Sequence, residues 1–111
     1  MAQNVREGTI QKAILDNLMY RGILCWREAR IPTPIRRGRK IVAFRRADPH
    51  TIGIPDVFCV IKGKLIGIEV KTAKGKQSDE QIAWQEKLEK AGGTYILARS
   101  WEDVEEVIKD F

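Results

Sequence analysis

The sequence has little of what several large classes of metal site and catalytic site require. Its 111 residues include one histidine, His50, and two cysteines, Cys25 and Cys59. No cysteine lies at zinc-ligand spacing from the histidine, and a single histidine in a polar loop argues against histidine-centred triads. Both cysteines lie in apolar stretches, so we expect buried free thiols in a reducing compartment.

The chain also lacks long apolar runs and a secretory leader. A membrane-spanning helix needs about eighteen or more consecutive apolar residues. We therefore expect a soluble intracellular protein with no membrane partner. Its length fits one domain over residues 1–111, with room for a single core.

Acidic residues are outnumbered by basic ones, which gives a net charge of +5 and a pI near 9.4. This balance favours a polyanionic partner. The candidate phosphate-binding residues lie in one crowded segment and just after the acidic motif described next: Arg36, Arg37, Arg39, Lys40, Arg45, Arg46, Lys74 and Lys76. Clustered cations can neutralise several phosphates, although a solvated, charged β-ribbon would account for the crowded segment equally well.

Acidic residues of functional interest lie on two apolar segments that are joined by Lys62-Gly63-Lys64. Asp56 directly precedes the first segment, residues 57–61, and Glu69-Val70-Lys71 ends the second. A glycine-containing turn predicts a hairpin, and antiparallel pairing would place Asp56 near Glu69. Because side chains alternate along a strand, Glu69 and Lys71 share a face and Val70 points the other way.

Two carboxylates so close would raise each other's pKa unless a cation neutralised them. Mg²⁺ or Mn²⁺ suits such oxygen ligands, and a neighbouring ammonium can orient a water or stabilise a charged phosphorane. Taken singly, each motif is more often a turn or a solvated charge pair. Together, on strands with apolar residues on both faces, the charges indicate a function, because burying unpaired charge is costly.

The remaining pattern predicts an α/β fold, a mixed sheet with helices packed on it, in the approximate order αβββαβα. Helices are expected over residues 4–22, over residues 79–91 and after Ser100. Further strands are expected from residue 23 toward residue 30, over residues 40–46 and over residues 95–98. Ser78 and Gln81 fit a capping box at the start of the second helix.

Two further features leave alternatives open. Glu7 lies one turn before Ile10 on the apolar stripe of the first helix, where it is either a surface charge favoured by the helix dipole or a third metal ligand. Near the C-terminus, Trp101, Val107 and Phe111 are either core packing or a dimer or DNA surface.

With Gly53-Ile54-Pro55-Asp56, Glu69-Val70-Lys71 and Ser78-x-x-Gln81 in view, the chain resembles the PD-(D/E)XK nuclease superfamily, and within it the VRR-NUC family. The resemblance covers almost the whole chain. It implies a restriction-endonuclease-like core and a metal-dependent DNA endonuclease of the stand-alone phage or bacterial type, located in the bacterial or infected-host cytoplasm. Similar stand-alone members act as homodimers on branched DNA such as four-way junctions.

By position, the resemblance implies that Asp56, Glu69 and the Val70 carbonyl bind Mg²⁺ or Mn²⁺, with help from Glu7. It implies that Lys71 is the catalytic lysine and that Gln81 is the family glutamine near the site, a role that its capping box does not exclude. The alternatives are a non-catalytic nucleic-acid-binding module with a nuclease fold and a nuclease for linear duplexes. Intact acids argue against the first, and the lack of an added sequence-reading domain argues against the second.

Overall fold

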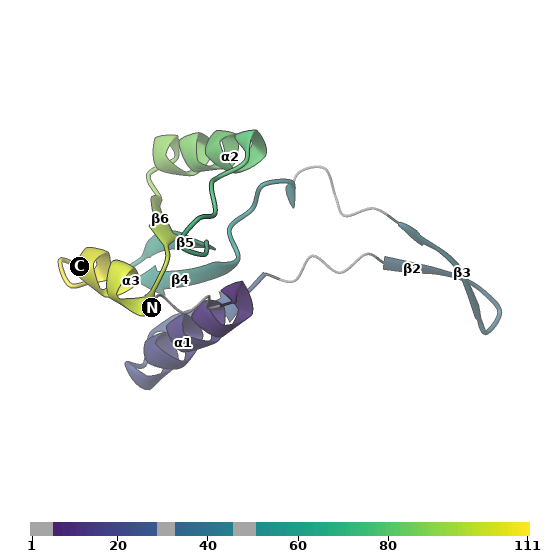
Figure 1. The fold of residues 1–111 in the computed structure, drawn as a ribbon, viewed down its shortest axis with the longest axis horizontal. Coiled ribbons are helices and arrows are strands. Elements are labelled where there is room, and N and C mark those ends of the chain that lie inside the picture. Colours follow the sequence, from purple (N-terminus) through teal and green to yellow (C-terminus); the bar gives the residue numbers. More distant parts are fainter. Residues whose placement is uncertain (1–5, 29–32, 46–50) are drawn as a thin grey trace.

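The computed structural model describes residues 6–28, 33–45 and 51–111. Within them the chain forms three helices and six strands (Figure 1): α1 (Glu7–Tyr20), β1 (Leu24–Arg27), β2 (Thr33–Arg37), β3 (Lys40–Arg45), β4 (Val57–Ile61), β5 (Lys64–Val70), α2 (Asp79–Lys90), β6 (Thr94–Ala98) and α3 (Trp101–Ile108). No helix among these residues is long and apolar enough to cross a membrane.

Four strands form the main sheet, in the order β1-β4-β5-β6. The first three pair antiparallel, and β6 runs parallel to β5. The expected mixed sheet is therefore confirmed. If the separate pair β2 and β3 is set aside, the element order is αβββαβα, as expected.

The central hairpin has the register that the sequence predicts. Lys62 and Gly63 both have positive φ, at 50° and 78°, as a two-residue turn of type I′ requires. The ladder runs from Ile61 opposite Lys64 to Val57 opposite Ile68. Continuing it by one residue brings Asp56 opposite Glu69.

The sheet has two different faces. On one face, α1 and α3 bury the main core: Ile10, Ile14 and Leu18 of α1, Val104 of α3, and Val57, Cys59, Ile66, Ile68, Val70, Ile96 and Ala98 of the sheet. On the other face, α2 packs through Leu88, close to Gly67 and Phe58. The alternation along β5 therefore puts Glu69 on the α2 face, while Val70 joins the main core.

Strands β2 and β3 form a separate two-stranded ribbon that stands apart from the main sheet (Figure 1). The sequence predicts only residues 40–46 as a strand here, so β2 was not expected. Pro34 lies within β2, where a residue that cannot donate is tolerated because the ribbon has open edges. Gly38, with φ at 60°, makes the turn.

Some expected boundaries were too wide. The first helix spans Glu7–Tyr20, and Gly22 with φ at 71° ends the turn that follows it; the expected start at residue 4 lies outside the described residues. Strand β1 ends at Arg27, and the expected continuation toward residue 30 lies partly outside the described residues.

Candidate active site

A tightly packed turn places Asp56 at the start of β4. Gly53 has φ at 84°, and a Cβ there would lie 2.3 Å from the Glu80 carbonyl oxygen, so only glycine fits against the first turn of α2. Pro55 is fully buried, and a Cβ on Gly67 would lie 2.9 Å from its Cγ. The turn is thus held against both α2 and β5, which fixes where Asp56 enters the sheet.

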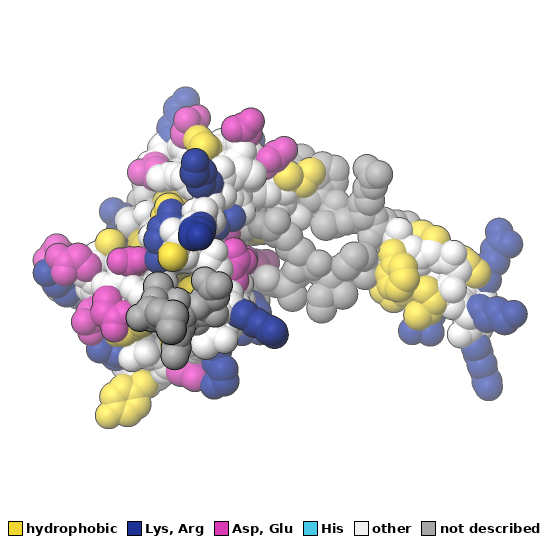
Figure 2. Space-filling view, in the orientation of Figure 1, with side chains coloured by type: hydrophobic (Ala, Val, Ile, Leu, Met, Phe, Trp, Pro, Cys, Tyr) yellow, Lys and Arg dark blue, Asp and Glu magenta, His cyan; other side chains and the backbone are white. Residues whose placement is uncertain are grey.

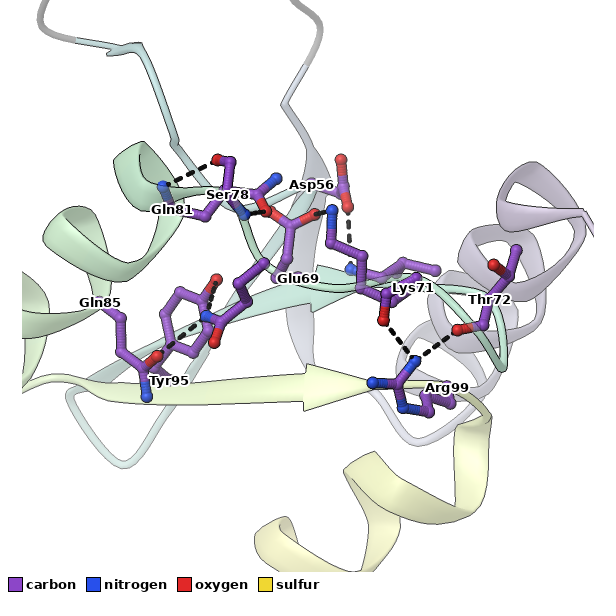
Figure 3. Close-up of polar contacts among 12 residues, drawn as sticks. Asp56, Glu69, Lys71, Thr72, Ser78, Gln81, Gln85, Tyr95 and Arg99 are labelled. Atoms are coloured by element: carbon purple, nitrogen blue, oxygen red, sulfur yellow. Dashed lines mark hydrogen bonds and ion pairs between the residues drawn. The ribbon is translucent and has the colours of Figure 1, made fainter.

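The Asp56 carboxylate is tied directly to β5. Its Oδ2 accepts a hydrogen bond from the Val70 backbone N–H at 2.9 Å (Figure 3). This contact is part-buried and joins the start of one strand to the end of its neighbour. The sequence expectation that Asp56 lies beside the Glu69-Val70 segment is confirmed.

Glu69 is the one charged side chain that the described part of the chain buries, with 2% of the residue exposed. The Lys71 Nζ lies 3.8 Å from its Oε2 and is itself only slightly exposed. A buried carboxylate is stable only when other groups compensate its charge. Lys71 supplies part of that compensation from the same face of the strand, as the alternation of side chains predicts (Figure 3).

The loop after Lys71 is held by a residue that the sequence analysis missed. Arg99 donates through Nη1 to the carbonyl oxygens of Thr72 and Gly75, the second at 2.9 Å (Figure 3). Gly75 in turn lies against the Lys71 side chain, since a Cβ there would be 3.3 Å from the Lys71 Cδ. Because β5 and β6 are parallel, their carboxyl ends share one edge of the sheet. This pairing appears only in the tertiary fold, so the sequence carried no local signal for a role of Arg99.

The start of α2 lies beside the acids and has the predicted cap. Ser78 Oγ accepts from the Gln81 N–H at 3.2 Å, and Gln81 Oε1 accepts from the Ser78 N–H at 2.9 Å. The capping box is therefore confirmed. Gln77, just before it, donates to Gln85 and to the Tyr95 hydroxyl, which ties the loop to α2 and β6 (Figure 3).

The structure does not gather every predicted ligand. Glu7 is exposed in the first turn of α1. Within residues 6–28, 33–45 and 51–111, no three histidine, cysteine, aspartate or glutamate side chains lie close enough to hold a metal ion. The part of the predicted ligand set that is brought together is Asp56, Glu69 and the adjoining Val70 backbone.

The predicted phosphate-binding residues fall in two places. Lys74 and Lys76 are exposed on the loop after Lys71. Arg36, Arg37, Arg39 and Lys40 are exposed at the turn end of the ribbon, whose residues 33–45 contain no acid (Figure 2). Arg45 ends β3, its side chain lying outside the described structure, as do Arg46 and His50.

Two remaining predictions concern the core. Cys25 and Cys59 are free thiols opposite each other on β1 and β4; Cys59 is buried as expected, whereas Cys25 is only partly buried. Cys59 is fully buried, which raises the pKa of its thiol to about 12, with a smaller contribution from Cys25. Trp101, Val107 and Phe111 are partly buried and pack against the main core, which is the core-packing alternative.

No family model matches the chain, and no curated protein matches it. A comparison with solved structures finds a chain described as a VRR_NUC domain, with a TM-score of 0.65 and 21% sequence identity. The similarity covers 95% of this chain and 96% of that one. The fold is thus a restriction-endonuclease-like mixed α+β fold. More particularly, it is the fold of a VRR_NUC domain.

Proposed function

We propose that this chain is a VRR-NUC nuclease that hydrolyses DNA phosphodiester bonds with the help of Mg²⁺ or Mn²⁺. One observation carries the proposal. Asp56, the buried Glu69 and Lys71 lie together at one edge of a sheet with the VRR_NUC fold, and the lysine nitrogen is 3.8 Å from the Glu69 carboxylate. Two carboxylates and an ammonium in one place are the groups that metal-assisted phosphodiester hydrolysis uses.

The side chains fit a hard divalent cation. Asp56 and Glu69 offer carboxylate oxygens from adjacent strands. The Val70 carbonyl is the nearby backbone oxygen expected to complete the set of metal ligands. When bound, the ion would act as a Lewis acid toward a phosphate oxygen and lower the pKa of a bound water. Glu7, exposed on α1, is proposed only to assist metal binding.

Lys71 has the role that depends most on position. The loop of residues 72–75 packs on its side chain and holds the ammonium next to the Glu69 carboxylate. From there the ammonium can orient an attacking water or offset charge as phosphorus becomes five-coordinate. Gln81 lies at the start of α2, where its side-chain NH2 group is proposed to contact the substrate while its side-chain oxygen keeps the cap.

DNA is the proposed substrate because the basic groups lie on the same side of the fold. Both the loop with Lys74 and Lys76 and the segment that leads to the ribbon leave the sheet at the edge that carries Asp56. Branched DNA and a homodimer are proposed on the resemblance described above. One chain offers one site, so cutting two strands requires two copies, most simply related by a two-fold axis.

The test is a cleavage assay on four-way junction, flap, splayed and linear DNA with Mg²⁺, Mn²⁺ or EDTA. The parental protein is expected to cut only with metal, and Lys71→Ala is expected to bind DNA while cutting at least a hundredfold more slowly. Lys87→Ala, which removes an exposed charge from α2, is the matched control. Cutting by Lys71→Ala at the parental rate would refute the lysine assignment. Binding by the parental protein without any cleavage would point instead to a non-catalytic binding module.

Mass measurement at micromolar concentration tests the dimer. A mass of twice 12.7 kDa is expected. A monomer alone would count against it.

A further inference from the structure

Three aromatic rings, called here the aromatic ladder, pack in a row across the α2 face of the sheet. The row runs from α2 to the outer strand β1. Trp84 of α2 contacts Phe58 of β4 edge-on, with ring centroids 5.8 Å apart. Trp26 of β1 stacks on Phe58, with centroids 5.7 Å apart and planes 22° from parallel. Phe58 is 4% exposed, whereas Trp26 is 39% exposed. Because β1 is the outer strand of the sheet, the indole of Trp26 is the last ring of the ladder.

The indole is also held in one orientation. Its Nε1–H donates to Glu28 Oε1 at 2.8 Å, and the Glu28 backbone N–H donates to the Asp56 carbonyl oxygen at 2.8 Å. The single polar group of the ring is therefore already satisfied. A large aromatic ring that is fixed and still exposed loses little entropy when a second ring stacks on it.

The position of Trp26 links it to the candidate active site. Trp26 pairs with Phe58, and Asp56 lies two residues before Phe58, on the same face of the sheet. Diagonal neighbours of this kind have Cα atoms about 7–8 Å apart. A DNA strand whose phosphate lies at Asp56 would thus bring a neighbouring base within reach of the indole.

We propose that Trp26 is a stacking platform for an unpaired nucleobase next to the bond that is cut. The inference rests on the proposed nuclease function and adds a substrate feature to it. Bases within an intact duplex are already stacked on both sides, so a protein ring can take only a base at a branch, a flap or an end. Stacking tolerates any base, because every base has a π-face.

The alternative occupant of this edge is a second copy of the chain, since Leu24 is also exposed on β1. The nucleobase is favoured because the exposed ring lies diagonally across from Asp56, near the end of the sheet from which the basic segments leave. If Trp26 lay in an interface between copies, truncating it would change the oligomeric state in solution. A nucleobase platform predicts that the oligomeric state stays the same.

The experiment combines protein variants with single abasic sites in the DNA. Trp26→Ala, Trp26→Phe and Tyr20→Ala are placed in a Lys71→Ala background, so that DNA binding can be measured with Mg²⁺ present and without cleavage. Tyr20, 90% exposed at the end of α1, is the matched control for losing an exposed aromatic ring. Binding is measured by fluorescence anisotropy on a set of splayed DNAs, each of which carries one abasic site at a different position near the branch point.

Trp26→Ala is expected to raise Kd by about 5- to 150-fold, the range that corresponds to one stacked base. Trp26→Phe should retain most of the affinity and Tyr20→Ala all of it. One abasic position should weaken the Trp26 protein by a similar factor and have no further effect on Trp26→Ala. This lack of additivity would identify the base that the ring contacts.

A flat abasic profile, or losses that multiply, would overturn the platform. So would a change from dimer to monomer in Trp26→Ala, because the ring would then be an interface residue. If the parental protein cuts DNA and the profile is flat, the nuclease assignment stands and the platform fails. If it never cuts and one abasic position still couples to Trp26, the platform stands and the nuclease assignment fails.

Discussion

Asp56 Oδ2 accepts a hydrogen bond from the Val70 backbone N–H at 2.9 Å, across 14 residues of sequence. The same carboxylate that is proposed to bind the metal ion therefore also fastens β4 to the end of β5. Function and stability can be separated here, because an amide oxygen can accept the same hydrogen bond but is a poorer metal ligand.

Asp56→Asn and Asp56→Ala should differ in stability and agree in activity. Asn keeps an acceptor for the Val70 N–H, whereas Ala leaves that part-buried donor without its partner, at a cost of about 1–3 kcal/mol. Urea denaturation measures the first quantity and the junction assay the second. Equal loss of stability in both variants would show that the hydrogen bond contributes little.

Removing charge from the ribbon should weaken DNA binding in a salt-dependent way. Replacing Arg36, Arg37 and Arg39 together by alanine is expected to lower the slope of log K against log salt by up to about three. The control replaces Lys87, Lys90 and Lys109, which removes the same charge from α2 and the end of α3. If both triple variants change the slope equally, only the net charge matters.

Gly53→Ala should destabilise the fold more than Gly22→Ala. Both positions have positive φ, so each substitution carries the cost of a left-handed conformation, about 1–2 kcal/mol. Only at Gly53 would the new Cβ also meet backbone, 2.3 Å from the Glu80 carbonyl oxygen. Thermal and urea denaturation of the two variants compare these costs. Similar losses would mean that α2 can shift away at no cost.

Arg99→Met should slow cleavage without weakening DNA binding. Losing the hydrogen bonds to the Thr72 and Gly75 carbonyls frees the loop that packs on Lys71. We expect kcat to fall by about tenfold to a hundredfold with KM unchanged, as misplacement of a catalytic group predicts. Arg99→Lys should restore part of the rate, and Lys90→Met is the control on α2. A rise in KM alone would assign Arg99 to substrate binding instead.

Stability should fall in alkaline solution because of Cys59. Burial raises the pKa of its thiol from 9.0 to about 12, so above pH 9 the unfolded chain loses a proton that the folded chain keeps. The contribution is complete below pH 9 and is lost as the pH rises toward 12, at about 1.4 kcal/mol per pH unit. Unfolding free energies of the parental protein and Cys59→Ala, compared from pH 7 to 10.5, should converge. Parallel curves would contradict the assignment.

Local sequence signals predicted the part of the site that lies on the hairpin. The turn at Lys62-Gly63 fixes the register, and alternation then places Asp56, Glu69 and Lys71 on one face. These rules act over short distances along the chain, so they need no knowledge of the tertiary fold. The capping box at Ser78 was predictable for the same reason.

Contacts set by the tertiary fold were beyond such rules. Arg99 reaches the Lys71 loop only because β6 docks parallel to β5. Trp26 reads in the sequence as one apolar residue of a strand, and only the pairing of β1 with β4 reveals the ladder that it ends. The helical position of Glu7 was predicted, but the structure does not bring Glu7 together with Asp56 and Glu69 as a set of metal ligands.

The pairing of Arg27 with Val57 closes the excursion that contains the ribbon at its base. The chain between β1 and β4 therefore leaves and re-enters the sheet at the same point. Lengthening a loop that is closed in this way costs little free energy. The segment is thus an exchangeable module: a hairpin of another length or charge could be grafted there, redirecting the protein toward different nucleic-acid shapes while the chemical machinery stays intact.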